Sequence, residues 1–255
     1  DDAANGDGFH SNSGVRICGA YSRHAGNPHF SFHLMFRQDY GAPKLIYPIH
    51  GDEGTSEFDA IDLRTSQNYS WSLHGDGANN TFLREEFTRK TQGAMGQPYA
   101  RGRSFHLYLN GQYWGLFGTD ERPEAGHGEA YFGGSKDDYD VVKSAGNGGG
   151  YTTELANGTN IAWQSLWDQA MAMRADPSNA RYFQMQGLAP DGVTPLNNPA
   201  HPRVLDADNQ IDYMLLVFWA GSSDAPLTGG ADLVNNWFAY RKRDSGSGFL
   251  HFAHD

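Results

Sequence analysis

Residues 104–143, SFHLYLNGQYWGLFGTDERPEAGHGEAYFGGSKDDYDVVK, are the most informative stretch of this chain. Over residues 105–109 apolar and polar side chains alternate, as in a strand with one face turned toward a core. Asn110-Gly111 then favours a type I′ turn, because that turn needs a positive φ at both central residues. An aromatic segment follows and ends at the charged pair Glu121-Arg122. The stretch therefore predicts a β-hairpin.

The composition indicates an acidic globular protein. With 255 residues, of which 38% are hydrophobic, the chain can bury the core of one large domain or of two lobes. The formal net charge of −11 disfavours nucleic acid and anionic membranes as partners. It would also repel a nucleotide unless cations gather locally at the binding site. No run approaches the ~20 apolar residues of a membrane span, so we expect no such span.

The single cysteine, Cys18, excludes an intrachain disulfide and a cysteine-based zinc site. Its apolar surroundings predict a buried, inert thiol. The sequence starts at Asp1 without a methionine, which indicates processing. Together with low lysine and high glycine, asparagine and aromatic content, this start favours an extracellular or cell-surface protein.

The order of elements predicts an α+β fold. Residues 1–13 are polar and form an N-terminal arm. The expected strands cover residues 14–20, 30–36, 45–49, 58–64 and 138–143, besides the hairpin and a final strand pair within 235–255. The expected helices cover residues 81–95, 161–175 and 211–221, with Asp208 or Asn209 as the N-cap of the last, and residues 129–132 form a helical turn. Residues 14–150 then form a strand-rich N-lobe with one helix, and residues 151–255 form a more helical C-lobe.

In this order the chain resembles the CotH-like (spore-coat-type) atypical protein kinases. The resemblance rests on GVRICGAYSR (14–23), the helix at 81–95, LYLNGQYWGLF (107–117), ERPEAGHGEAYFGG (121–134), DYDVVK (138–143) and the segment 224–255. It implies a two-lobed kinase-like fold. It also implies transfer of phosphate from ATP to a protein hydroxyl, with Mg²⁺ or Mn²⁺ as cofactor.

The resemblance implies a catalytic centre near the end of the chain. Asp224 matches the catalytic aspartate, and Asn236 (or Asn235) and Asp255 match the metal ligands. An aspartate after a buried helix can accept a hydroxyl proton, and Mg²⁺ prefers oxygen ligands. Asp232 is the rival for the catalytic role, because it lies nearer the two asparagines. Family members continue past Asp255, so either this chain extends further or it is a processed product with an incomplete C-lobe.

Two further residues concern the nucleotide phosphates. His29 stands where the family usually has a phosphate-binding lysine, and Arg23 and Arg37 are alternative cations. In a kinase-like lobe, Glu85 on the helix at 81–95 would orient that cation. Taken alone, the helix favours the alternative that Glu85 forms an ordinary i,i+4 pair with Arg89 on a solvated helix.

The resemblance assigns two more residues to the cofactor. Glu121 lies where the chain passes between lobes, and would accept a hydrogen bond from the ribose or adenine. The alternative for Glu121 is a salt bridge at the end of a strand. Lys143 matches a phosphate ligand, although lysines at exposed strand ends are common.

Three functions follow from these observations. The first is a secreted or surface kinase that acts on a protein substrate. The second is a non-catalytic structural or binding protein of a cell surface or extracellular matrix, on a degenerate kinase-like fold (a pseudokinase) with a surface-assembly partner; His29, the acidic charge and the end at Asp255 favour it. The third is a carbohydrate-binding β-rich module, which would explain the many tryptophans and tyrosines but not the helical second half.

Overall fold

The structure is a computed structural model that describes residues 8–19, 23, 27, 29–65, 81–147, 150–222, 224–226, 235–244 and 246–254. The described chain has an α+β fold with antiparallel sheets, which confirms the predicted class. It forms two compact units, residues 1–86 with 101–122 and residues 87–100 with 123–255.

The first unit is built on an antiparallel sheet with the strand order β1-β2-β5-β7-β6. These strands are β1 (Gly14–Cys18), β2 (Ser31–Met35), β5 (Ala60–Thr65), β6 (Gly102–Leu109) and β7 (Gln112–Asp120). The unit also contains the strand pair β3 (Leu45–Ile46) and β4 (Glu57–Phe58), and the 3₁₀ helix η2 (Gly51–Glu53). The strands expected over residues 14–20 and 30–36 are confirmed with shorter bounds, and the strand expected over residues 58–64 corresponds to β5, with Phe58 at the end of β4.

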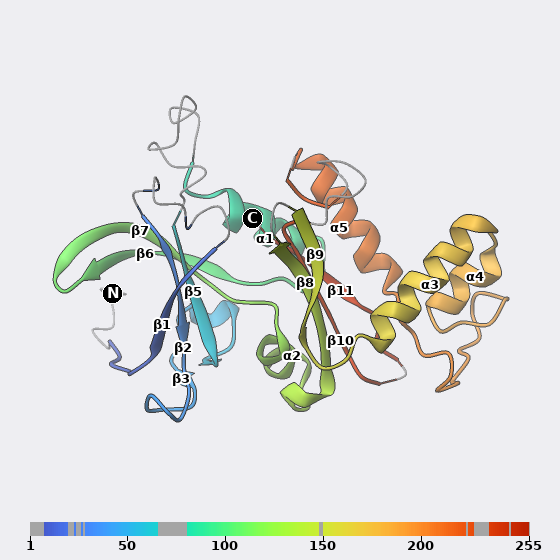
Figure 1. Cartoon of the computed structure of the whole chain (residues 1–255), viewed down its shortest axis with the longest axis horizontal. Coiled ribbons are helices and arrows are strands. Elements are labelled where there is room, and N and C mark those ends of the chain that lie inside the picture. The colour runs from blue at the N-terminus through green and yellow to red at the C-terminus, as the bar shows by residue number, and fades with distance from the viewer. Residues whose placement is uncertain are drawn as a thin grey trace. The chain divides into compact units, whose positions relative to one another are not determined.

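The hairpin predicted from residues 105–117 forms as β6 and β7 (Figure 1). Asn110 and Gly111 both have positive φ, at 51° and 81°, as a type I′ turn requires. The ladder runs from this turn back to the pair Gly102 and Asp120, so β7 delivers Glu121 at the far end of the sheet.

The strands of the first unit have one apolar and one polar face. The apolar core consists of Phe36, Leu45, Ile49, Phe58 and Ile61. Leu34 and Leu63 pack against it, so alternate residues of β2 and β5 point to the opposite face. That opposite face is polar and carries His33, Asp62 and Arg64.

The second unit contains an antiparallel sheet with the order β11-β10-β8-β9. Its strands are β8 (Tyr139–Asn147), β9 (Gly150–Asn157), β10 (Trp237–Lys242) and β11 (Leu250–Ala253). Its helical segments are α2 (Ala125–Phe132), η5 (Lys136–Asp138), α3 (Ile161–Ala175), α4 (Asn179–Met185) and α5 (Ala207–Trp219). Helix α1 (Arg84–Ala94) begins in the first unit and continues into the second. The lobe boundary expected near residue 150 falls within the β8–β9 hairpin.

Two apolar clusters form the core of the second unit. One joins β8, β10 and the helices through Val142, Ala162, Met185, Val204, Tyr213, Val217, Ala225, Trp237, Ala239 and Phe249. The other packs α2 on the sheet through Ala125, Tyr139, Val141, Phe238, Tyr240 and Phe252. Helices α3 and α4 lie side by side (Figure 1). Helix α4 was not predicted from the sequence.

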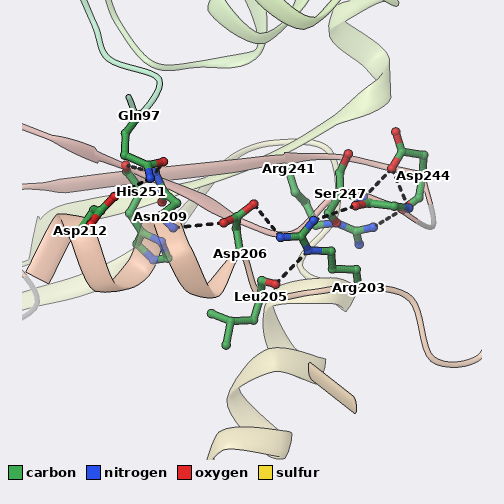
Figure 2. Close-up of polar contacts among 11 residues, drawn as sticks. Gln97, Arg203, Leu205, Asp206, Asn209, Asp212, Arg241, Asp244, Ser247 and His251 are labelled. Carbon is green, nitrogen blue, oxygen red and sulfur yellow. Dashed lines mark hydrogen bonds and ion pairs between the residues drawn. The ribbon is translucent and has the colours of Figure 1, made fainter. Parts of the chain in front are cut away.

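Polar contacts fix the start of α5 (Figure 2). The carboxylate of Asp206 accepts a hydrogen bond from the Asn209 N–H at 3.1 Å, so Asp206 is the N-cap and the prediction of Asp208 or Asn209 is wrong. Arg203 donates to the same carboxylate at 2.8 Å. The buried amide of Asn209 in turn accepts from the backbone N–H of His251 at 2.6 Å, which ties α5 to β11.

Helix α5 was expected to be buried, and only its inner face is. Tyr213, Leu216 and Val217 are buried in the core. Its outer face is apolar and exposed, at 52–68% of each side chain's surface, at Ile211, Leu215, Phe218 and Trp219. The prediction failed because an apolar run in a sequence does not show which side of a helix the core covers. No helix among the described residues is both long enough and apolar enough to cross a bilayer.

Candidate functional site

Asp224 is the centre of a small polar cluster just after α5. Its Oδ1 accepts a hydrogen bond from the Asn235 side-chain amide at 2.9 Å, and its Oδ2 accepts one from the Asn236 amide at 3.0 Å. Asp224 itself is exposed, whereas Asn235 is buried. The structure thus brings together Asp224 and both asparagines that the sequence singled out, and uses Asn235 and Asn236 together rather than as alternatives.

The backbone at Asn236 explains how two consecutive amides reach one carboxylate. In a regular strand, consecutive side chains point to opposite faces. Asn236 has φ of 50°, in the left-handed region, immediately before β10 begins at Trp237. Asparagine adopts this region more readily than other residues with a side chain. The turn therefore directs both amides to Asp224.

Lys143 lies on β8 opposite Phe238, two residues beyond Asn236 along β10. Its ammonium nitrogen is 5.8 Å from the centre of the Phe238 ring and 3.7 Å from Oε1 of Glu124. Glu124 directly precedes α2. The sequence pointed to Lys143 but missed Glu124, which no spacing rule connects to it.

Metal ligation was predicted at Asn236 and Asp255. Asp255 lies outside the described residues, as does Asp232, the rival for the catalytic role. Within the described ranges, no three His, Cys, Asp or Glu side chains gather as a metal site. The described donors near Asp224 are its own carboxylate and the two amides.

In the first unit, Glu85 forms an ion pair with Arg64. Nε of Arg64 donates to Oε2 of Glu85 at 3.1 Å, and Glu85 is buried. The sequence predicted that Glu85 would orient a cation, but the cations considered were His29, Arg23 and Arg37. A signal for Arg64 was present: in β5 the apolar Ile61 and Leu63 alternate with charged residues, so Arg64 had to leave the core face.

His29 lies among aromatic side chains. The centre of its ring is 5.5 Å from that of Trp114 and 6.2 Å from that of Phe117, and the residue is half-buried. Its role as a phosphate ligand stays a prediction.

Glu121 is buried at the end of β7. Its Oε2 accepts a hydrogen bond from the Arg101 N–H at 2.8 Å, and the Arg101 guanidinium lies 3.9 Å away. Nδ1 of His50 is 3.8 Å from the other carboxylate oxygen. These contacts match the strand-end salt bridge that the sequence left open; a contact with a ribose or adenine stays a prediction.

A second buried carboxylate, Asp62, lies on the polar face of the first sheet. It accepts from Nδ1 of His33 at 2.6 Å and from Arg122 at 2.7 Å. Burial raises the pKa of Asp62, but the His33 hydrogen bond and the Arg122 charge outweigh it and hold that pKa well below its usual range. Asp62 is therefore ionised at every physiological pH.

Cys18 lies at the end of β1 and is half-buried. Burial, helped by the charge of Asp62, raises the pKa of its thiol to about 11. The thiol is therefore protonated at neutral pH. The residue was predicted to be buried and is only half-buried, and its inertness stays a prediction.

Comparison with known protein families gives a match over nearly the whole chain. The profile of the family described as CotH kinase protein matches residues 15–251, which is most of the chain. None of the curated proteins compared is significantly similar in sequence.

Proposed function

This chain belongs to the CotH kinase family, and from that premise we propose that it transfers a phosphoryl group from ATP to a hydroxyl of a protein substrate, on a two-lobed kinase-like fold. The observation that carries the proposal is the Asp224 carboxylate, exposed to solvent and held by the amides of Asn235 and Asn236. A kinase needs an oriented carboxylate to accept the substrate's proton, with an asparagine beside it.

Asp224 is the proposed base. Two hydrogen bonds of 2.9 and 3.0 Å fix the plane of its carboxylate while its surface stays open to a substrate hydroxyl. The residue requires no further activation to accept a proton as that hydroxyl attacks, because positioning is the larger part of catalysis in phosphoryl transfer.

The donor set at Asp224 fits a hard divalent cation. A carboxylate oxygen only accepts hydrogen bonds, so each asparagine must turn its nitrogen toward Asp224. The amide oxygen of the half-buried Asn236 then points away from Asp224 and is an oxygen ligand of the kind Mg²⁺ and Mn²⁺ prefer. Asn236 and Asp255 are the proposed ligands. When bound, the cation would neutralise charge that develops on the phosphate oxygens.

Lys143 is the proposed phosphate ligand of the second unit. Its side chain is 19% exposed, and its ammonium nitrogen lies near Glu124 and the Phe238 ring. His29, Glu85 and Glu121 are the proposed nucleotide contacts of the first unit, and the composition supports an extracellular or cell-surface location.

A second candidate function is a non-catalytic surface or matrix protein on a degenerate kinase-like fold. The observation that favours it is His29, which replaces the expected lysine and packs against Trp114 and Phe117. A histidine is only partly charged at neutral pH and is a weaker phosphate ligand than lysine.

The test is calorimetric titration of ATP with Mg²⁺ or Mn²⁺ into the purified chain, followed by phosphoryl transfer to casein as a generic acceptor. Asp224→Asn should bind ATP as the wild type does but transfer phosphate about 10²–10⁴ times more slowly, the usual effect of losing a general base. Asp208→Asn, an exposed acid on α5, is the matched control and should change neither.

Asp255→Ala distinguishes metal binding from base catalysis, since it should weaken the metal-dependent binding of ATP. If the folded wild type binds no ATP with either cation, the kinase proposal is wrong and the non-catalytic function stands. Equal transfer rates in Asp224→Asn and the wild type would remove Asp224 from the catalytic role.

A further inference from the structure

Strand β6 forms one edge of the first sheet. In the strand order β1-β2-β5-β7-β6 it pairs with β7, and none of the described strands pairs with it on the other side. A strand in this position turns the backbone N–H and C=O groups of alternate residues away from the sheet. At eight residues, β6 is longer than the usual strand of about 5–6 residues, so its edge can accept a further strand.

Two contacts show which residues of β6 bond to β7. At the start of the strand, the Glu121 N–H donates to the Arg101 carbonyl at 2.9 Å, so the backbone of Arg101 faces β7. At the other end, the two-residue turn pairs Leu109 with Gln112, and the residues that flank such a turn exchange backbone hydrogen bonds. Because bonded and outward residues alternate along an antiparallel strand, the odd-numbered residues 101–109 bond to β7.

The even-numbered residues of β6 therefore direct their backbone groups away from β7. Three of them, Ser104, His106 and Tyr108, are exposed, whereas Gly102 is buried. The register shift in the hairpin leaves the extra residue, Trp114, on β7, so β6 itself stays regular. The edge thus offers three successive outward positions to another strand.

Strand β6 lacks the features that usually keep an edge from pairing. Natural edge strands are protected by charged side chains, prolines and bulges. Residues 104–119 contain no Asp, Glu, Lys, Arg or Pro. The edge strand β9, also of eight residues, carries Glu154. In a chain with a net charge of −11, the uncharged edge of β6 is where two copies can approach with little repulsion.

From this geometry we infer that β6 pairs antiparallel with β6 of a second copy of this chain, about a twofold axis at His106. In that register His106 lies opposite the same residue of the other copy. Ser104 of each copy lies opposite Tyr108 of the other. All three exposed outward positions then exchange backbone hydrogen bonds across an isologous interface.

The same register matches the side chains on the other face of β6. Phe105 of each copy lies opposite Leu107 of the other, and both side chains are half-buried in the monomer. Apolar pairs at such non-hydrogen-bonded positions approach closely and stabilise a sheet. Arg103 lies opposite Leu109, so the two arginines are not opposed. The strand is therefore complementary to itself, which favours a second copy over an unrelated strand.

The first test is sedimentation velocity of the whole chain at pH 7.4 and physiological salt, over a concentration series that reaches several hundred micromolar. One strand pair is a small interface, so we expect a weak and reversible dimer. The average mass should rise with concentration from 28.1 kDa toward twice that value. A monomer at every concentration would overturn the inference.

Proline at residue 104 tests whether backbone groups make the contact. Ser104→Pro removes an outward N–H but no bond to β7, so the monomer should still fold, as circular dichroism can verify. Each dimer would lose two hydrogen bonds, and its dissociation constant should rise about tenfold or more. Ser104→Ala is the matched control, because it keeps the N–H and should dimerise as the wild type does. Equal dissociation constants in the two variants would show that β6 does not pair through its backbone.

Cross-linking tests the register. In a Cys18→Ser background, His106→Cys places the two thiols at the axis, where facing Cα atoms are about 5.5 Å apart and a disulfide can form. Ser104→Cys places them four residues apart along the strands, about 13 Å, which is beyond the reach of a disulfide. Diamide, a two-electron oxidant of thiols, should therefore cross-link His106→Cys at least several-fold faster, as non-reducing electrophoresis would show. Equal rates in the two variants would refute this register and the inference with it.

The pairing of β6 does not depend on phosphoryl transfer, because none of the residues proposed to act in transfer lies on this strand. Asp224→Asn should dimerise as the wild type does, whether or not it transfers phosphate. Leu215→Ser, on the exposed face of α5, should also keep the dimer. Loss of the dimer in Leu215→Ser with an intact dimer in Ser104→Pro would place the contact on α5 and overturn the inference.

Discussion

At Asp224 and at Arg64, a side chain of ordinary type gains a defined direction from its neighbour. Both oxygens of Asp224 are engaged by amides, so the carboxylate has one orientation. Arg64 has one because Glu85 holds its Nε. Such preorganisation is what separates a site from a surface charge, since an unheld side chain must lose rotamer entropy on binding.

The burial of a single residue, His251, makes the stability of the protein depend on pH. Its ring lies in the core near Trp237 and Tyr213, with centres 6.1 and 5.7 Å away. Burial lowers the pKa of His251 from 6.5 to about 4. Between those values the unfolded chain binds a proton that the folded chain does not, so acid favours unfolding in this window.

We therefore expect the free energy of unfolding to fall by about 3 kcal/mol through this residue as the pH decreases from 7 to 4. His251→Phe should lack that component, and His201→Gln, at an exposed histidine, should keep it. Urea denaturation at several pH values measures it. Parallel pH profiles of the wild type and His251→Phe would show that His251 is not the group responsible.

At the scale of elements, α5 is the part on which the site depends, because the chain leaves it at Trp219 and reaches Asp224 five residues later. Its start is fixed by Asp206, and its first turn is bonded to β11 through Asn209. Loss of the cap would free the first N–H groups of the helix.

Asp206→Ala should lower the free energy of unfolding by about 1–2 kcal/mol, because it removes the N-cap and the contact with Arg203. Asp208→Ala removes an exposed acid from the same turn and should cost less. Urea denaturation of both variants distinguishes them, and an equal loss in the two would contradict the assignment of Asp206 as the cap.

Elements with a strong local signal were predictable from the sequence. Asn110-Gly111 fixed the turn of a hairpin, and the apolar spacing of residues 161–175 gave α3 with its observed bounds. Helix α4 is short, and its signal was overlooked: Ser178 after Pro177 is a helix cap, and its hydroxyl accepts from Arg181 N–H at 3.3 Å. The sequence does not tell which face of a helix a core will cover, so the exposure of α5 was missed.

The part of the site whose residues lie close together in the sequence was predictable. Asp224 and the two asparagines lie within 13 residues of one another, and a motif could connect them. Arg64 and Glu85 belong to a strand and a helix whose pairing depends on tertiary structure. No spacing rule connects them, so only the structure identifies Arg64 as the partner.

At the scale of the whole molecule, charge and exposed apolar surface oppose each other. The net charge of −11 at neutral pH keeps molecules apart. Against it, Ile211, Leu215, Phe218 and Trp219 leave an apolar stripe on α5, and the exposed Phe87 lies beside Trp219, with ring centres 6.0 Å apart. Exposed apolar patches of this kind favour association once repulsion is removed.

We expect light scattering to show self-association as the pH falls from 7 toward the isoelectric point of about 5.3. The double substitution Leu215→Ser and Phe218→Ser should reduce it. Val193→Ser, which replaces an exposed valine away from α5, is the control and should not reduce self-association. Unchanged association in the double variant would assign the effect to another surface.

Few residues could replace Asn236 and keep both its backbone conformation and its hydrogen bond to Asp224. Glycine would accept its left-handed backbone but bring no amide, and aspartate would accept the backbone but turn a second negative charge toward Asp224. Glutamine carries the amide one methylene too far and on a less permissive backbone. Asparagine therefore meets both demands, and a substitution of Asn236 would leave Asp224 held by the Asn235 amide alone.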